Sequence, residues 1–127
     1  MNYKELFKFC VVGGIGTIVN LGLLYSLTEW FGVYYLLSSC IAIELSIISN
    51  FILNDQWTFR ENKSKHIIKR ALYYQLISLI GLSIQLTTVY ILTDIINIYY
   101  ILSGAIAIGI VVAWNYTVNK RITFRSD

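Results

Sequence analysis

Two asparagines four residues apart, followed by an arginine, occur twice in this chain and are its most informative polar groups. The two sets are Asn50, Asn54 and Arg60, and then Asn115, Asn119 and Arg125. On a helix, residues four apart share one face. Carboxamides both donate and accept hydrogen bonds, and a guanidinium can hold a phosphate through two. The pattern predicts contacts with a polar ligand that carries phosphate, whereas close helix packing through small and polar residues is the alternative.

Further basic residues stand close to the second set. Lys120 and Arg121 lie one turn before Arg125, and Arg70 lies where a long apolar stretch begins. Placed at the headgroup level of a membrane, these side chains suit the phosphate of a lipid whose tail lies in the bilayer. We therefore predict a lipid-phosphate site, and the alternative is that the cations only fix the orientation of the chain. The candidates are Arg60, Arg70, Lys120, Arg121 and Arg125.

Three polar residues fall in the middle of apolar stretches. Glu44 is the one ionisable group at that depth, while Asn20 and Gln85 occupy matching positions 65 residues apart. A carboxylate in hydrocarbon is either protonated or faces a partner or a wet cavity. Glu44 therefore either faces a transported headgroup or proton, or acts as neutral glue between helices. For Asn20 and Gln85, pairing between helices competes with binding of sugar hydroxyls.

The sequence contains none of the residue patterns that are typical of a catalytic site. It has no glycine-rich nucleotide loop, no paired carboxylates and no nucleophile with a base, and no metal site or cofactor is expected. Cys10 and Cys40 have no metal or redox spacing, and His66 stands alone in a polar loop. We predict a protein that is not an enzyme and that binds no nucleic acid.

The elements that must position these groups are membrane helices. Hydrophobic residues make up 57% of the 127 positions and charged residues only 13%. Four apolar stretches are each close to the ~20 residues that a helix needs to cross a bilayer. They contain no Lys or Arg, which argues against a soluble bundle with polar stripes. The expected class is an all-α membrane protein with helices at about 9–28, 36–53, 72–93 and 101–118.

The basic residues predict the orientation of the chain. All ten lie before the first helix, in the central loop or at the end, and that loop includes Lys63, Lys65 and Lys69. By the positive-inside rule both termini and the loop are expected to be cytoplasmic. The expected location is the cell (cytoplasmic) membrane, as a multi-pass protein. Tyr34 and Tyr99, in the opposite connections, are typical of an interfacial aromatic belt.

The two halves of the chain are alike. Without a gap, twelve of the 27 positions in 34–60 are identical to those in 99–125. We infer a tandem duplication, with repeat 1 at about 5–62 and repeat 2 at about 70–127 in one membrane domain. Each repeat crosses twice, so the repeats are parallel, with an axis along the membrane normal.

These residues together resemble the GtrA-like family of small four-helix membrane proteins. The resemblance covers nearly the whole chain. It rests on Phe7-Lys-Phe-Cys-Val-Val-Gly-Gly-Ile-Gly-Thr-Ile-Val-Asn20, Ala42-Ile-Glu44, Asn50-Phe-Ile-Leu-Asn54, Trp57-Thr-Phe-Arg60, Asn115-x-x-x-Asn119-Lys-Arg and Thr123-Phe-Arg125. Asp55-Gln56 departs from the family, where the first motif is usually basic, and this shifts weight to Lys120 and Arg121.

The resemblance implies translocation of a polyprenyl-phosphate-linked monosaccharide from the cytoplasmic to the outer face, for cell-envelope polysaccharide or glycan modification. It implies the sugar lipid, membrane lipids and membrane glycosyltransferases as partners. Two alternatives remain: an anchor or accessory subunit of a glycosyltransferase, and a small proton-coupled exporter, against which the strong charge bias argues. Because four short helices enclose little space, a homo-oligomer is also expected, with glycine- and alanine-rich faces as contacts.

Overall fold

A computed structural model describes residues 2–60 and 66–125, so Lys63 and Lys65 of the predicted basic loop lie outside the described residues. Within the described residues all regular structure is helical. The four long helices are α1 (Tyr3–Tyr25), α2 (Tyr35–Leu53), α3 (Ile67–Tyr90) and α4 (Tyr100–Val118). Each continues into a single wider π-helical turn: η1 (Ser26–Trp30), η2 (Asn54–Thr58), η3 (Ile91–Ile95) and η4 (Asn119–Thr123).

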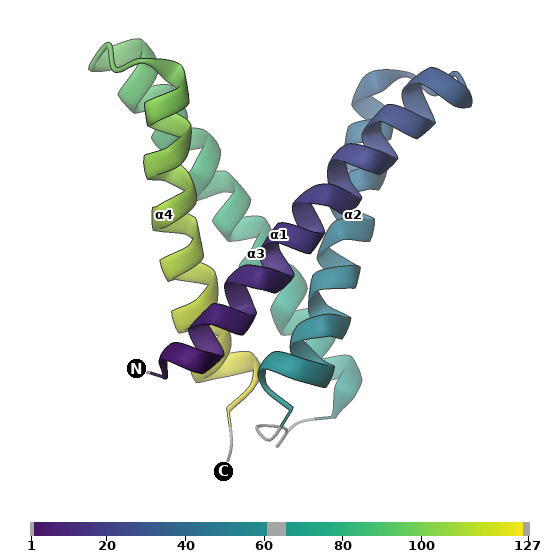
Figure 1. The fold of residues 1–127 in the computed structure, drawn as a ribbon, viewed down its shortest axis with the longest axis vertical. Coiled ribbons are helices and arrows are strands. Elements are labelled where there is room, and N and C mark those ends of the chain that lie inside the picture. Colours follow the sequence, from purple (N-terminus) through teal and green to yellow (C-terminus); the bar gives the residue numbers. More distant parts are fainter. Residues whose placement is uncertain (1, 61–65, 126–127) are drawn as a thin grey trace. The chain divides into compact units, whose positions relative to one another are not determined.

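The chain divides into two compact units, unit 1 (Met1–Asn62) and unit 2 (Lys63–Asp127). Each is a hairpin of two antiparallel helices, with α1 packed on α2 and α3 packed on α4 (Figure 1). The elements η1, α2 and η2 have counterparts in unit 2 that begin and end 65 positions later. The same offset of 65 positions separates the two similar segments of the sequence from which we predict a duplication.

Each helix is long and apolar enough to cross a membrane. Together with their π-helical turns, the four candidate spans are Tyr3–Trp30, Tyr35–Thr58, Ile67–Ile95 and Tyr100–Thr123. They extend beyond the apolar stretches predicted from sequence because the helices continue into polar flanks. Asn2 caps α1 by accepting from the backbone N–H of Glu5, and the His66 side chain likewise caps α3. The protein is thus an all-α membrane protein with four candidate spans in the described residues.

The connection between the helices of each hairpin is tight and has the same form in both units. Gly32 and Asn97, 65 positions apart, adopt the left-handed backbone region with φ of 67°. Glycine enters this region without steric cost, and asparagine is one of the few other residues that tolerate it. The next residue donates its N–H back into the helix, Val33 to Leu27 O at 2.9 Å and Ile98 to Leu92 O at 2.8 Å. These bonds close the turn.

A line of small residues makes the helix contact within each hairpin. Ser38, Ala42 and Ser46 of α2 are buried, as are Ser103 and Ala107 of α4. Ser46 Oγ donates to the carbonyl of Gly16 on α1 at 2.8 Å. Small side chains let two helix backbones approach closely in a membrane, where packing rather than the hydrophobic effect holds helices together. The line that continues through the paired asparagines therefore faces the partner helix of the same hairpin.

Candidate functional site

The first asparagine of each predicted pair packs on a glycine of the neighbouring helix. The carboxamide of Asn50 lies against Gly16, where an added Cβ would overlap it. In unit 2 a Cβ on Gly81 would come within 2.7 Å of Asn115 Oδ1. Both Oδ1 atoms are buried and have no hydrogen-bond partner among the described residues. A buried acceptor without a donor lowers the free energy of unfolding by roughly 1–3 kcal/mol. A contribution to stability therefore does not explain why these two positions carry an amide.

The second asparagine of each pair has a structural task. Asn54 and Asn119 are buried, and each carboxamide oxygen accepts a bond of 2.7 Å from a threonine hydroxyl one turn on, Thr58 or Thr123. Asn119 Nδ2 also donates to the backbone carbonyl of Asn115 at 2.8 Å. The two threonine bonds lie inside the π-helical turns η2 and η4, and the bond to Asn115 ties η4 to α4. We therefore assign Asn54 and Asn119 to positioning those turns.

A buried phenylalanine closes the end of each hairpin just after these turns. Phe59 meets the ring of Phe9 edge-on, with ring centroids 6.2 Å apart, and Phe124 meets Tyr74 at the same separation. Both phenylalanines have only 1% of their surface exposed. Their N–H groups bond to the carbonyls of Asn54 and Asn119. The recurring Thr-Phe-Arg segment thus anchors the end of the hairpin and leaves its arginine outside.

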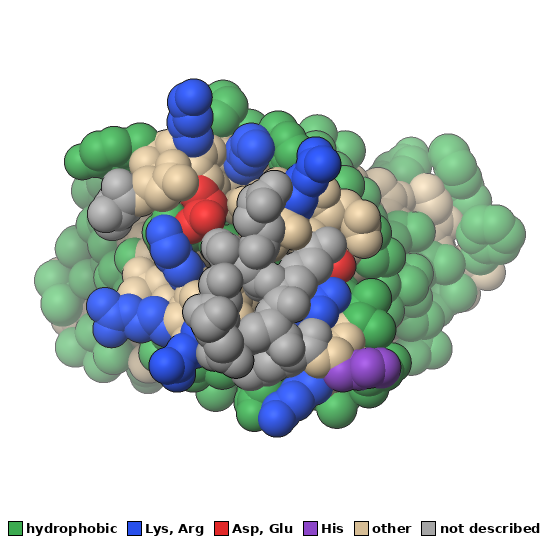
Figure 2. Space-filling model, turned by 90° about the horizontal axis from the view of Figure 1, so that it is seen from below, with side chains coloured by type: hydrophobic (Ala, Val, Ile, Leu, Met, Phe, Trp, Pro, Cys, Tyr) green, Lys and Arg blue, Asp and Glu red, His purple; other side chains and the backbone are tan. Residues whose placement is uncertain are grey.

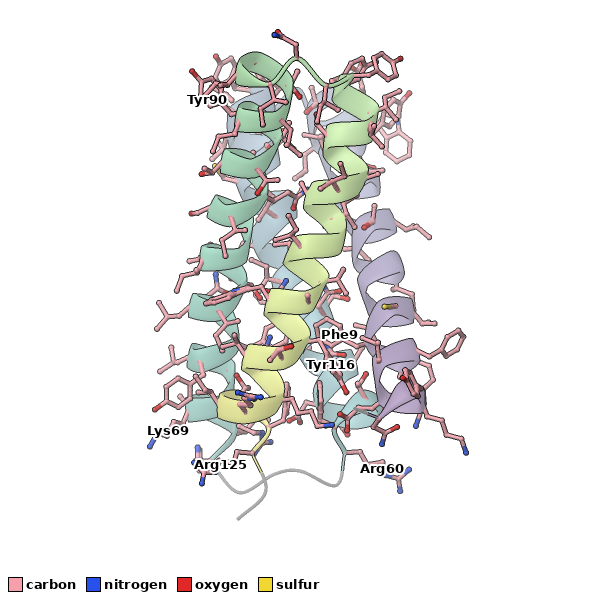
Figure 3. All side chains as sticks on the ribbon, turned by 90° about the vertical axis from the view of Figure 1, so that its left-hand side faces the viewer. Phe9, Arg60, Lys69, Tyr90, Tyr116 and Arg125 are labelled. Carbon is pink, nitrogen blue, oxygen red and sulfur yellow. The ribbon has the colours of Figure 1, made fainter. Side chains whose placement is uncertain are left out.

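Basic side chains gather at the end of unit 2 where α3 begins and η4 ends. Lys69 and Arg125 both lie there, whereas Tyr90 lies at the other end of α3 (Figure 3). The view from below shows Lys and Arg side chains, in blue, together with acidic side chains, in red (Figure 2). We call the predicted phosphate ligands of this end, Arg70, Lys120, Arg121 and Arg125, the cationic end of unit 2; Lys69 lies at the same end but was not a predicted ligand. Because α3 packs on both α4 and η4, residues far apart in sequence meet at this end.

The four side chains of the cationic end differ in how far they are exposed. Arg70 is buried, with 7% of its surface exposed. Lys120 is half-buried: its Nζ donates to the Tyr116 hydroxyl at 3.4 Å and lies 5.6 Å from the centroid of that ring. Arg121 and Arg125 are exposed. A cation over an aromatic face is attracted by the ring quadrupole, so Tyr116 holds Lys120 close to the helix.

The matching end of unit 1 has a different charge. Arg60 is exposed there, and Lys8 stacks over Trp57 at 5.4 Å. Two acids, Glu5 and Asp55, are buried at this end, with 9% and 2% of their surfaces exposed. Arg60 is the one predicted phosphate ligand that lies in unit 1, at an end of the hairpin that also holds these two buried acids.

The three polar residues at mid-span are not brought together with the cations. Asn20 and Gln85 are half-buried, one turn beyond Gly16 and Gly81 on the same faces of α1 and α3. Glu44 is exposed on the surface of the chain, two residues from both Ala42 and Ser46. At 100° per residue that offset places it on the side of α2 opposite the hairpin contact. Glu44 therefore points away from α1.

Several residues of the site were missed by reading the sequence. Gly16 and Gly81 make room for the asparagines, and Tyr116 contacts Lys120. Neither role can be recognised from residue type and spacing in the sequence. The available signal was their place in the repeat, since Gly16 aligns with Gly81, and Tyr116 aligns with Phe51. In the described residues no group of three His, Cys, Asp or Glu side chains could hold a metal ion.

Comparison with known proteins gives the family. The curated "Dolichol-phosphate mannosyltransferase" of Pyrococcus furiosus (strain ATCC 43587 / DSM 3638 / JCM 8422 / Vc1) is 29% identical to this chain over 120 residues. The match covers 94% of this chain but only 34% of the relative, so the chain spans about a third of that protein's length. A family model described as "GtrA/DPMS, transmembrane domain" matches residues 8–124. The chain therefore belongs to the GtrA/DPMS transmembrane domain family.

Proposed function

We propose that this protein binds a polyprenyl-phosphate-linked monosaccharide at the cytoplasmic face of the cell membrane and moves its headgroup to the outer face. The observation that carries this proposal is the cationic end of unit 2, where four basic side chains border apolar membrane spans. A phosphate at the headgroup level can be held there by guanidinium and ammonium groups while the prenyl tail stays in lipid. Family membership and the name of the mannosyltransferase relative support a lipid of this class.

The unpaired carboxamide oxygens give such a headgroup places to bind deeper in the membrane. Moving a sugar phosphate through hydrocarbon is costly unless its lost contacts with water are replaced. Asn50 and Asn115 offer acceptor atoms within the spans, and Asn20 and Gln85 follow one turn further out. Sugar hydroxyls are the donors that these acceptors suit. Direction would follow from synthesis of the lipid on one face and its use on the other, without a nucleotide.

A second candidate is a membrane domain that anchors or assists a glycosyltransferase. The specific observation in its favour is that the match covers only about a third of the mannosyltransferase relative. In this proposal the cationic end presents the lipid phosphate to an enzyme, and the two hairpins translocate nothing. Membrane glycosyltransferases are partners in both proposals.

Purified protein in liposomes separates the two candidates. A fluorescent polyprenyl-phospho-sugar is placed in the liposome membrane, and a membrane-impermeant quencher reports how much of it is on the outer leaflet. Liposomes with a translocator exchange the label between leaflets, so that nearly all of it is quenched over time, whereas those with an anchor keep about half protected. A label that stays protected at the rate of empty liposomes would contradict translocation and leave the anchoring role.

A further inference from the structure

Two threonine hydroxyls are buried without a hydrogen-bond partner at equivalent places in the two units. Thr28 lies in η1 and Thr93 in η3, and the Oγ1 atom of each is buried and unpaired among the described residues. The turn η1 packs on α2, and η3 packs on α4 in the same way. Because the same atom is left unpaired in both units, the feature belongs to the repeated architecture and is not an accident of one hairpin.

Other threonines of the hairpins do find acceptors. In η2 and η4, the hydroxyls of Thr58 and Thr123 each donate to an asparagine oxygen at 2.7 Å. In α3, Thr88 donates to the backbone carbonyl of Ile84, also at 2.7 Å. A threonine in a helix commonly satisfies its hydroxyl in this local way, one turn back along the chain. A buried threonine oxygen without any partner is therefore an exception that needs its own explanation.

Stability does not explain the choice of threonine at these two positions. The residues one turn earlier are Leu24 and Val89, whose side chains cannot accept a hydrogen bond as the asparagines of η2 and η4 do. Burying a hydroxyl without a partner is unfavourable, and valine would fill the same space without that cost. Within a membrane span, the surrounding hydrocarbon cannot supply the missing partner. A bound ligand with hydroxyl groups can supply it.

Both hydroxyls can turn toward such a ligand. Thr28 and Thr93 are half-buried residues, although their oxygens are buried. Rotation about χ1 exchanges the hydroxyl and methyl branches of a threonine, and threonine uses two such rotamers in helices. The hydroxyl can thus reach a group beside the hairpin without a change in the backbone.

The threonines lie at the end of each hairpin away from the basic residues. In unit 2, Tyr90, which directly precedes η3, lies at one end, and Lys69 and Arg125 lie at the other (Figure 3). In unit 1, the whole segment from Phe9 to Phe59 contains no Lys or Arg. Neutral hydroxyls without a nearby cation suit an uncharged sugar rather than a phosphate.

We propose that Thr28 and Thr93 bind hydroxyl groups of the sugar at the end of each hairpin away from the cations. The inference rests on the proposed function for the identity of the lipid, and it adds the residues that receive the sugar once the headgroup has crossed. A hydroxyl can donate one hydrogen bond and accept others, so it pairs with a sugar hydroxyl in either sense. The repeat gives one such position in each unit.

The test compares the binding of two fluorescent lipids to the full chain in nanodiscs of neutral phosphatidylcholine. One is a polyprenyl-phospho-sugar, and the other is the same polyprenyl phosphate without the sugar. We expect the wild-type chain to bind the sugar lipid more tightly. Thr28→Val with Thr93→Val should reduce this preference by about tenfold, the effect of one lost hydrogen bond, and should leave the affinity for the sugar-free lipid unchanged.

Two controls separate the loss of the hydroxyls from the loss of structure. Thr88→Val removes a hydroxyl that is already paired with Ile84, so the preference should remain. Thr28→Ser with Thr93→Ser keeps both hydroxyls and should also keep the preference. The thermal unfolding midpoint of the double valine variant should rise, because an unpaired buried oxygen has been removed. A lower midpoint would show that the hydroxyls already have partners, and it would overturn the proposal.

The binding assay also keeps this site apart from transport. An unchanged preference for the sugar lipid in the folded double valine variant would overturn the roles of Thr28 and Thr93. If the wild-type protein exchanges label between leaflets in that case, the proposed function stands without these residues. Loss of the preference in the variant, together with a wild-type protein that fails the liposome assay, would preserve the sugar site and reject translocation.

Discussion

The carboxamide of Asn50 lies directly on Gly16, so that the two helices of unit 1 touch where a side chain on α1 would not fit. Asn115 and Gly81 repeat this contact in unit 2, with somewhat more room. The relationship joins a glycine and a buried amide that are 34 residues apart in each unit. The contact leads to a test of stability.

We expect Gly16→Ala to destabilise the protein by about 1–3 kcal/mol, because the new methyl group overpacks the contact with Asn50. Gly81→Ala should cost less, since its nearest contact is longer. The matched control is Gly14→Ala, because a Cβ there meets nothing within 4 Å. The thermal unfolding midpoint in detergent measures all three. An equal midpoint for Gly16→Ala and Gly14→Ala would show that the contact is absent.

The π-helical turns should depend on their threonines. Thr123→Val removes the hydroxyl that donates to the buried Asn119 Oδ1 and keeps the shape of the side chain. We expect a loss of roughly 1–3 kcal/mol in the free energy of unfolding, because the acceptor is left without its donor. Thr117→Val changes an exposed threonine of α4 and should be close to neutral. Thr58→Val should reproduce the effect in unit 1, and Thr123→Ser, which retains a hydroxyl, should largely restore stability.

The cations of η4 are expected to matter for activity and not for insertion. Replacing Lys120 and Arg121 with Gln should abolish glycosylation of the cell envelope, because the lipid phosphate loses two positive partners. Membrane fractionation and blotting measure insertion, and glycan staining measures the product. Lys4→Gln, which removes an exposed cation at the start of α1, is the control. Normal glycosylation in the double variant would remove the phosphate-binding role of these residues.

Glu44 tests whether a mid-span carboxylate takes part in transport. It lies on the side of α2 that faces away from α1, so its removal should leave the hairpin contact intact. A role in transport predicts that Glu44→Gln slows the liposome exchange by about tenfold, the effect of one lost hydrogen bond. Glu29→Gln, which changes an exposed residue of η1, is the control. Full activity of Glu44→Gln would favour a neutral structural role.

The orientation of the hairpins can be read by cysteine labelling. With Cys10 and Cys40 replaced by Ser, a Cys at the exposed Asn97 should react with a membrane-impermeant maleimide on intact cells. A Cys at Arg60 should react only after the membrane is opened, because the positive-inside rule places that end in the cytoplasm. Labelling of the Arg60 position from outside would reverse the topology and move the cationic end to the wrong face for a lipid made inside.

Much of the architecture could be predicted from the sequence because composition and spacing act locally. A long run of apolar residues without Lys or Arg favours a membrane helix, whose backbone hydrogen bonds lie within the segment. The interval of 65 residues predicted matching elements, and close helix packing was the alternative that the sequence offered for the paired asparagines. The cations were found as candidates because Lys and Arg are absent from the apolar stretches and lie only beyond their ends.

Only the tertiary structure decided what the polar residues do. Asn50 and Asn54 look equivalent in the sequence, yet Asn54 is bonded to Thr58 while Asn50 Oδ1 is buried without a donor in the described part of the chain. The burial of Glu5 and Arg70, and the support of Lys120 by Tyr116, depend on which helix faces pack together. Residue type and spacing fix which elements form, but the partner of a side chain is set by contacts between segments far apart along the chain, and these exist only after the hairpin has closed.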